Sequence, residues 1–204
     1  MMPLTIPELY QKLCEPSFQN PQFGDLFYNF FIYQYPANEE YAIREQIVDF
    51  KEKLVRPVNN IDVLTLNLFE EFCQFLDHQP FGRKYTSYLQ YVMEKEAQNS
   101  EAFLSTLKQK ASSEHFFRFI HERIMSHITI QDELHRPYVF VYGIGSIYPY
   151  LRTSEFQAKY EQFNKTDQYK VILFYPGYQD GSRYKLFGIL DDQHTYRAIP
   201  LINA

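Results

Sequence analysis

The first candidates for chemistry in this chain are the glycines of the Gly143-Ile144-Gly145 segment. They follow an apolar run and precede a helical pattern, which is where a dinucleotide-binding or phosphate-binding loop would lie. A dinucleotide fingerprint needs a third glycine where this sequence has Tyr148, and the Gly-Lys-Ser/Thr triplet of a phosphate loop does not occur. We interpret the segment as a tight turn between a strand and a helix. A nucleotide-responsive switch or enzyme that uses residues 143–146 remains the alternative.

The histidines could bind a metal ion only if several of them faced the same way. His115, His121 and His127 are spaced by six residues, which turns each side chain by about 240° from the previous one on an ideal helix. Three imidazoles that point in three directions cannot coordinate one ion. The HExxH pattern is also absent from the sequence. The sequence therefore predicts no metal site.

Ser146, Cys14 and Cys73 are the candidate nucleophiles. Ser146 follows a glycine, but the Gly-x-Ser-x-Gly elbow of hydrolases would need another glycine at Tyr148. Neither cysteine has a recognisable base beside it in the sequence, and two cysteines so far apart are typical of a reducing compartment. We therefore expect no catalytic residue and no cofactor, and we expect a protein that is not an enzyme but acts by binding other proteins.

The composition is that of a folded, acidic protein. The 204 residues are 45% apolar, which suits one domain over residues 1–204. The net charge of −5 argues against direct DNA binding, although a local patch of Arg183, Lys185 and Arg197 remains an alternative. No signal peptide and no run of about 20 apolar residues is found. We expect a cytoplasmic protein without membrane contact.

Near-continuous apolar runs indicate strands that are buried on both faces, as in a parallel sheet. These runs cover residues 30–35, 61–66, 138–142 and 171–175. Two shorter strands are predicted near the C-terminus, over residues 184–190 and 195–201, with a turn at Asp191-Asp192-Gln193. The predicted fold class is α/β, a Rossmann-like and mostly parallel sheet flanked by helices.

Helical patterns lie between the predicted strands. Asn38 is a plausible cap for the first helix, which carries one apolar stripe and ends at Pro57. That stripe consists of Ile43, Ile47, Phe50 and Leu54. Residues 67–136 are too long for one crossover, and we interpret them as a helical insertion. Its predicted helices span residues 67–78, 83–98, 100–111 and 113–129, with Ser100 and Ser113 as caps and Phe116, Ile120, Ile124 and Ile128 as a second stripe.

A Tyr-Pro dipeptide ends two of the apolar runs, at Tyr35 and Tyr175, and another lies a few residues after a third run, at Tyr148. Proline lacks an amide donor and should mark the end of each strand. Because the carboxyl ends of parallel strands lie at one edge, we expect these tyrosines to gather there with neighbouring glycines. They either fix the shapes of the loops or line a binding surface. One of the Tyr-Pro bonds could also be a cis turn.

Several of these segments resemble the BrxB family. The string from Gly143 to Arg152 is similar to the GxGxxYPxxR segment of that family. Leu173 to Gly177 with Asp180-Gly181, then Leu186 to Gly188, continue the resemblance in the same order. The run from Phe31 to Pro36, followed by Glu40 and Arg44, matches as well. The helical middle of the chain is less diagnostic.

The resemblance implies a role in BREX, a bacterial and archaeal defence system against phage. It implies an assembly or adaptor component whose partners include a PglZ-like protein and could extend to a BrxC-like ATPase and a PglX-like methyltransferase. It brings no catalytic residue, no small-molecule substrate and only indirect DNA contact. The predicted partner-binding residues are Tyr35, Gly143, Gly145, Tyr148, Arg152, Tyr175, Gly177, Asp180 and Arg183.

Overall fold

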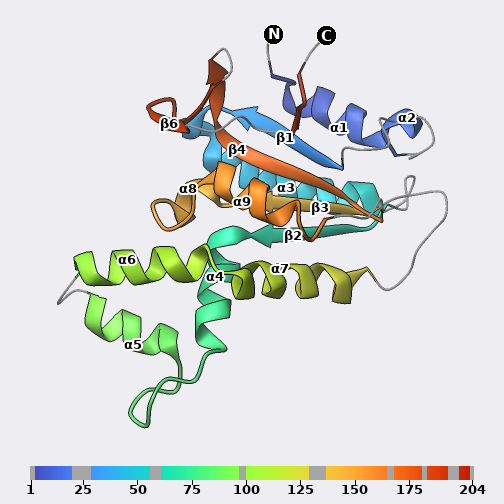
Figure 1. Cartoon of the computed structure of the whole chain (residues 1–204). Helices are drawn as coiled ribbons and strands as arrows, with labels where there is room; N and C mark the ends of the chain where they lie inside the picture. Colours follow the sequence, from blue (N-terminus) through green and yellow to red (C-terminus); the bar gives the residue numbers. More distant parts are fainter. Residues whose placement is uncertain are drawn as a thin grey trace.

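The computed structural model is a three-layer α/β fold with a mostly parallel sheet between two layers of helices (Figure 1). It describes residues 3–19, 29–55, 61–96, 100–128, 137–164, 168–180, 183–192 and 198–202. The predicted fold class is confirmed, with the helical stretch in the middle of the chain on one face of the sheet.

Five parallel strands form the main sheet, in the order β2-β3-β4-β1-β7. Their bounds are β1 Phe30–Tyr35, β2 Val63–Asn67, β3 Tyr138–Tyr142, β4 Lys170–Asp180 and β7 Ile199–Pro200. All four strands predicted from the apolar runs are present, and β2 is shifted by one or two residues from the predicted 61–66. Strands β1 and β2 are consecutive in the chain, but β3 and β4 lie between them in the sheet.

Each central strand is buried on both faces because its side chains alternate between the two layers. Phe31 and Tyr33 of β1 lie in the core on one side of the sheet, whereas Phe30 and Ile32 lie in the core on the other. The apolar run of β1 therefore contributes side chains to both cores. This explains why the sequence of these strands does not alternate between apolar and polar residues.

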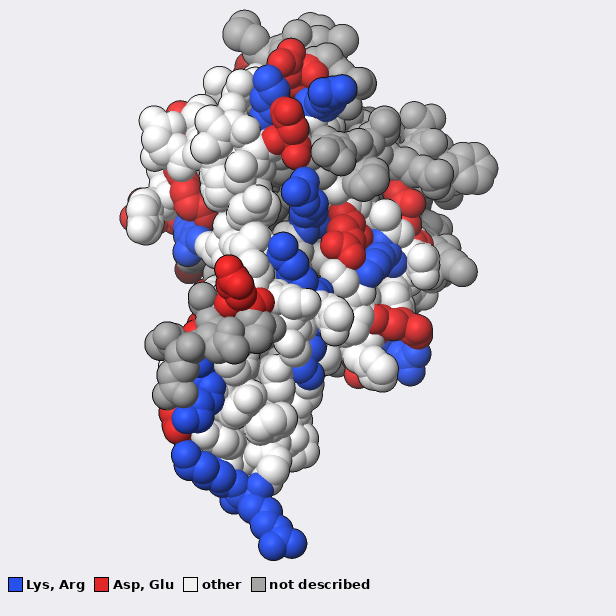
Figure 2. Space-filling view, turned by 60° about the vertical axis from the view of Figure 1, so that its left-hand side comes forward, with Lys and Arg blue, Asp and Glu red and all other residues white. Residues whose placement is uncertain are grey.

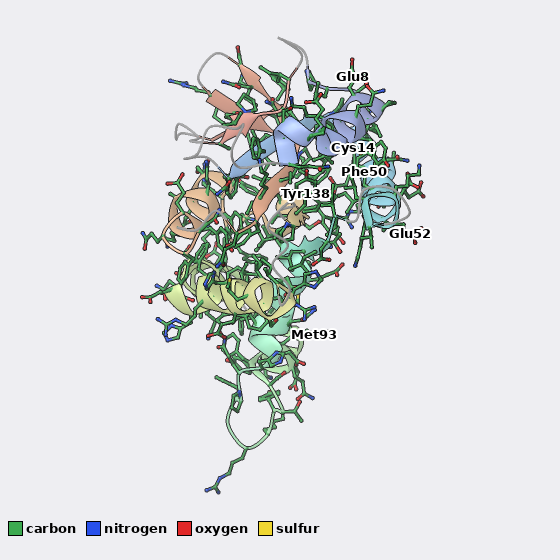
Figure 3. The ribbon with its side chains drawn as sticks, turned by 90° about the vertical axis from the view of Figure 1, so that its right-hand side faces the viewer. Glu8, Cys14, Phe50, Glu52, Met93 and Tyr138 are labelled. Carbon is green, nitrogen blue, oxygen red and sulfur yellow. The ribbon has the colours of Figure 1, made fainter. Side chains whose placement is uncertain are left out.

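The first helical layer consists of α1 (Ile6–Cys14), α2 (Pro16–Gln19) and α3 (Glu40–Val55). The predicted stripe of α3 is confirmed, since all four of its residues are buried. Figure 3 shows Phe50 on the inner side of α3 and Glu52 on the outer side. The predicted cap Asn38 is wrong, because it lies inside the short 3-10 helix η1 (Ala37–Glu39) that precedes α3.

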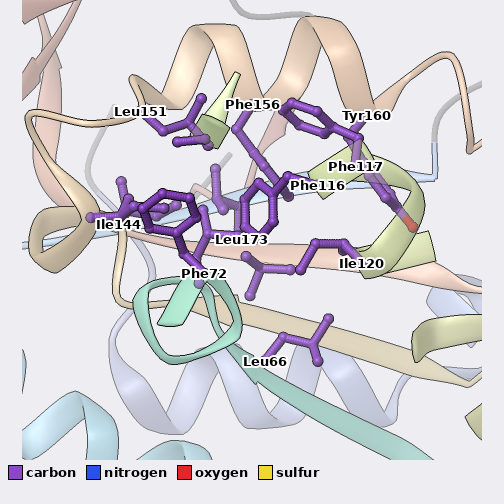
Figure 4. Packing of buried hydrophobic residues seen from close by; sticks show 14 of the residues in the cluster. Leu66, Phe72, Phe116, Phe117, Ile120, Ile144, Leu151, Phe156, Tyr160 and Leu173 are labelled. Carbon is purple, nitrogen blue, oxygen red and sulfur yellow. The ribbon is translucent and has the colours of Figure 1, made fainter. Parts of the chain in front are cut away.

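The second layer contains α4 (Leu68–Asp77), α5 (Tyr88–Lys95), α6 (Ser100–Ala111) and α7 (Glu114–His127), followed by α8 (Ile144–Ile147) and α9 (Thr153–Tyr160). These helices close an aromatic core over the sheet, in which Phe72 of α4 meets Phe116 of α7 with ring centroids 5.3 Å apart (Figure 4). Ser113 caps α7 as predicted, through a bond from the Phe116 amide to its hydroxyl.

Helix α5 begins five residues later than the predicted 83–98 segment. Ser87 caps it, accepting a hydrogen bond from the Gln90 amide at 3.2 Å. The residues before Ser87 form a loop in which Phe81 and Tyr85 pair as an isolated bridge. This loop and α5 project away from the sheet (Figure 1).

The C-terminal strands differ from the prediction. Strand β4 does not end at Tyr175 but continues through Pro176 to Asp180, and it pairs there with β5 (Arg183–Leu186) in antiparallel fashion. The carbonyl of Pro176 still accepts a hydrogen bond, from the Phe187 amide at 2.7 Å, so the proline does not end the strand. Strand β6 (Leu190–Asp192) pairs with β5, so Asp191 and Asp192 lie in a strand rather than in the predicted turn. Residues 193–197 lie outside the described residues.

Candidate protein-binding edge of the sheet

The carboxyl ends of β1, β2 and β3 meet at one edge of the sheet, where α3, α4 and α8 begin. Strand β4 alone passes this edge. Its last residues, Gly177 to Asp180, form with β5 and β6 a small antiparallel sheet that we call the arm. Figure 2 turns the side of the molecule with α8 and β6 toward the viewer and shows acidic and basic side chains interspersed over it.

A polar chain of contacts links the N-terminal part of this edge to the glycine segment. The Tyr35 hydroxyl donates to Glu40, whose other carboxylate oxygen accepts from Arg44 Nε at 2.9 Å. Arg44 Nη2 also donates to Ser146 Oγ at 3.1 Å. Burial, followed by the bond to Glu40, keeps the pKa of Tyr35 well above its ordinary value, so this hydroxyl stays protonated. These hydrogen bonds therefore fix the start of α3 against α8.

Gly143 is required by both its conformation and its surroundings. Its φ of +74° lies in the left-handed region, and a Cβ atom there would lie 2.2 Å from Asn67 Oδ1. Asn67 caps α4 through its bond from the Phe69 amide at 3.2 Å, and its Nδ2 donates to Glu70 at 2.7 Å. The glycine therefore lets β3 turn directly beside the capped start of α4.

Gly145 is covered by the arm. A Cβ atom at this position would lie 2.6 Å from the Phe187 ring. Helix α8 is only four residues long, and the space beside Gly145 is filled by this aromatic ring. The predicted tight turn is thus found at residues 143–146, and both glycines are used for close packing.

The three tyrosines were expected to gather at this edge, and two of them are buried there rather than open to a partner. Tyr35 and Tyr175 are 2% and 0% exposed, and they belong to the cores on opposite faces of the sheet. The physical reason is the alternation of side chains along β1 and β4, which sends both rings inward. Tyr148 is half-buried and packs against the larger core, and its bond to Pro149 is cis.

The inner face of the arm is anchored in the core. Tyr184 is buried, and its ring stands edge-on to Tyr175 at 5.6 Å between centroids. Burial raises the pKa of Tyr184 to about 12. The buried side chain of Gln34 accepts from the Gln179 amide at 2.6 Å, which ties the arm to β1. Tyr175 and its neighbours therefore position the arm.

Three large apolar side chains of the arm are partly exposed. Tyr178, Phe187 and Ile189 are 49%, 38% and 79% exposed, and we call them the arm patch. The turn that presents them has positive φ at Phe187 (57°) and at Gly188 (76°). The Tyr178 hydroxyl donates to the Gly188 carbonyl at 3.3 Å, so the Tyr178 side chain lies against the turn that carries the other two. Exposed apolar groups of this kind mark interaction sites on proteins.

Charged side chains from the predicted set lie on the arm or contact it. Arg152, exposed at the start of α9, donates to the Asp191 carbonyl at 3.3 Å. Asp180 pairs with Lys185 at 3.0 Å, and Arg183 is exposed on the same strand as Lys185. The structure thus brings Arg152, Asp180 and Arg183 to the arm, whereas Arg197 of the suggested basic patch lies outside the described residues.

Gly177 also serves the arm. A Cβ atom there would lie 2.1 Å from the Lys185 carbonyl oxygen, so glycine is needed where β4 and β5 begin to pair.

The residues that the sequence reasoning missed are those of the arm patch and Asn67. The signal for the patch was the alternation of Tyr184 and Leu186 with polar residues before Gly188, which is typical of a half-buried strand followed by a turn.

The described part of the chain contains neither a candidate metal site nor a candidate membrane-spanning helix. Within it, no group of three or more histidine, cysteine, aspartate and glutamate side chains is placed to hold a metal ion. The helix histidines have local surroundings instead: His127 lies 3.0 Å from Asp62, and the ring of His121 lies against Phe163. No helix among the described residues is long and apolar enough to cross a membrane.

Comparisons with known proteins agree with the resemblance seen in the sequence. The family described as BREX protein BrxB matches residues 64–201. A BREX protein BrxB from Bacillus cereus (strain H3081.97) is 24% identical over 204 residues, which cover 97% of this chain and 96% of that protein. No solved structure matches the chain. The matched segment includes α4 to β7 and the whole of the arm, and the chain belongs to the BrxB family of the BREX phage-defence system.

Proposed function

We propose that this chain is a non-catalytic connector in a BREX complex and that it docks a larger component, such as a PglZ-like protein, through the arm. The observation that carries the proposal is the arm patch, because it exposes three large apolar side chains on β4 and on the β5–β6 turn, in an arm whose inner face is firmly packed. Membership of the BrxB family supports other BREX proteins as partners.

The surroundings of the patch suit a protein partner. Apolar side chains at the centre, with arginines and paired charges at the rim, are the usual composition of a protein–protein interface. Arg152 and Arg183 supply the rim, and the backbone bond to Asp191 holds Arg152 beside the patch. Aromatic residues and arginines contribute much of the binding energy of such interfaces.

Co-purification with the PglZ-like protein of the same BREX system tests the proposal. Ile189→Asp places a charge at the most exposed residue of the patch and is expected to weaken association at least tenfold. Met93→Asp on α5 is the matched control, because Met93 is 75% exposed, close to the 79% of Ile189. Equal association of the wild type and both variants, each with an unchanged melting temperature, would overturn the arm as the docking surface.

The same experiment distinguishes the roles of Arg152 and Tyr148, which are both partner-binding residues predicted from the sequence. Arg152→Glu is expected to weaken association with little effect on the melting temperature, because Arg152 is exposed. Tyr148→Ala is expected to lower the melting temperature too, because Tyr148 packs against the core.

A thermal-shift series with nucleotides distinguishes the connector from the nucleotide-responsive switch, since a ligand that binds the folded state raises its stability.

A further inference from the structure

A groove lies on the helical layer, well apart from the arm. It has a volume of about 520 Å³ and is open to solvent. Its walls come from α4, α6 and the start of α7, and they consist of Phe75, Gln79, Thr106, Gln109, Lys110, Ser113 and His115. Sites that bind drug-sized ligands have volumes of about 300–1,000 Å³, so the groove is large enough for a few residues of a peptide.

Lys110 is the charged group of this groove. Its ammonium donates to Gln79 Oε1 at 2.6 Å and lies 4.1 Å from the centre of the Tyr88 ring. No carboxylate pairs with it among the residues that the structure describes. Burial lowers the pKa of Lys110, and no acidic neighbour offsets that effect. The groove therefore presents a partly dehydrated cation whose charge is not neutralised.

Two acidic residues that are close in sequence to residues of the groove have partners of their own. Glu114 pairs with Arg118 at 2.6 Å on the exposed side of α7, and Asp77 accepts a hydrogen bond from Ser87 at 2.6 Å. The remaining polar groups of the groove are neutral amides and hydroxyls, joined by the exposed imidazole of His115. These groups suit the carbonyl and amide groups of a peptide, and Phe75 supplies an apolar wall.

We propose that this groove binds a short acidic peptide segment of another protein, with one carboxylate on Lys110 and an apolar side chain against Phe75. A carboxylate gains a charge-assisted hydrogen bond from the ammonium, of a kind about twice as strong as a neutral one. A phosphate group would call for several cations or a ring of amides, whereas the groove offers one lysine among amides. The proposal rests on the connector function only for the source of the segment, because the binding itself needs no BREX partner.

Fluorescence anisotropy with the isolated protein tests this site. The probe is the labelled peptide Glu-Phe-Asp-Leu-Glu with blocked ends, compared with the neutral peptide Gln-Phe-Asn-Leu-Gln and with inorganic phosphate as a competitor. We expect the acidic peptide to bind at least tenfold more tightly than the neutral one. Lys110→Met is expected to abolish this difference, and Lys110→Arg to restore most of it.

Matched variants separate the groove from general charge effects. Lys108→Met removes the same charge from an exposed position on the same helix and is expected to leave the affinity unchanged within about twofold. If Lys110→Met fails to fold, Gln109→Glu adds a repelling carboxylate at the exposed rim and should weaken the acidic peptide. Equal binding of the two peptides, equal losses for the two lysine variants, or full competition by phosphate at the peptide's own concentration would each overturn the proposal.

Discussion

At the scale of single residues, the edge of the sheet depends on glycines at positions where a Cβ atom would not fit. Gly143 and Gly177 illustrate this, since a Cβ atom would overlap the Asn67 side chain in one case and the Lys185 carbonyl in the other. These glycines allow backbones to approach each other closely. Close packing thus accounts for the glycine at each of these two positions.

Gly143→Ala is expected to lower the free energy of unfolding by about 3 kcal/mol or more, because the left-handed conformation costs an L-residue about 1–2 kcal/mol and the overlap with Asn67 adds to that cost. Gly82→Ala is the control. Gly82 has a similar φ of +67°, but a Cβ atom there would have nothing within 4 Å, so only the conformational cost of about 1–2 kcal/mol applies. Urea denaturation of the two variants measures the difference, and equal losses would contradict the packing role of Gly143.

Two tyrosines show where reasoning from residue types was too coarse. A tyrosine before a proline at a strand end is compatible with an exposed rim and with a buried anchor, since the ring is apolar and the hydroxyl is polar. Tyr35 is buried with its hydroxyl on Glu40, and Tyr175 is buried against Tyr184. The direction of each side chain depends on the strand pairing, which the dipeptide alone does not encode.

At the scale of the elements, the contact between the arm and α8 is the least expected feature. Phe187 lies over Gly145, so an element formed near the C-terminus closes the loop that follows β3. The arm is held on its other side by the bond between Gln34 and Gln179. Strand β1, the β3–α8 turn and the arm therefore form one connected edge.

A double-mutant cycle tests this contact. Gly145→Ala alone is expected to destabilise the protein by about 1–3 kcal/mol, because the Phe187 ring has to move. In a Phe187→Ala background the same change should cost no more than a few tenths of a kcal/mol, since the space is then free. The background Ile189→Ala serves as the comparison, and Gly145→Ala should keep its full cost there. Additive effects of Gly145→Ala and Phe187→Ala would show that the two residues do not touch.

The elements were predictable to different degrees, for physical reasons. The strands and the stripes of α3 and α7 follow from local apolar patterns, and the Ser113 cap follows from residue type. The arm was mispredicted because Pro176 keeps its carbonyl in the strand pairing and because the turn has a phenylalanine at positive φ, a conformation rare for non-glycine residues. The order of the strands depends on tertiary packing, which no local pattern contains.

At the scale of the whole molecule, the two proposed binding surfaces are well separated. The arm lies at one end of the molecule, and the helices α5 and α6 lie toward the other (Figure 1). Figure 3 shows from the side that α5, with Met93, lies away from the sheet that contains Tyr138. A connector needs such a separation if it is to contact two partners at once.

Independent surfaces should respond independently to substitution, because effects at sites without shared partners add. Ile189→Asp is therefore expected to leave the affinity for the acidic peptide within about twofold of the wild-type value, although it weakens association with the PglZ-like protein. Anisotropy titration of this variant measures the first quantity. A tenfold loss of peptide affinity in Ile189→Asp would indicate that the arm and the groove are parts of one site.

The strand order also has a consequence for synthesis on the ribosome. Strand β1 precedes β2 and β3 in the chain, but its two neighbours in the sheet, β4 and β7, are made only after β2 and β3. At about 5–20 residues per second, the apolar run of β1 leaves the ribosome several seconds before β4 can pair with it. During that interval the nascent chain carries an unprotected, aggregation-prone strand. The central pairing of the sheet, and with it the arm that extends from β4, can form only after β4 has been made.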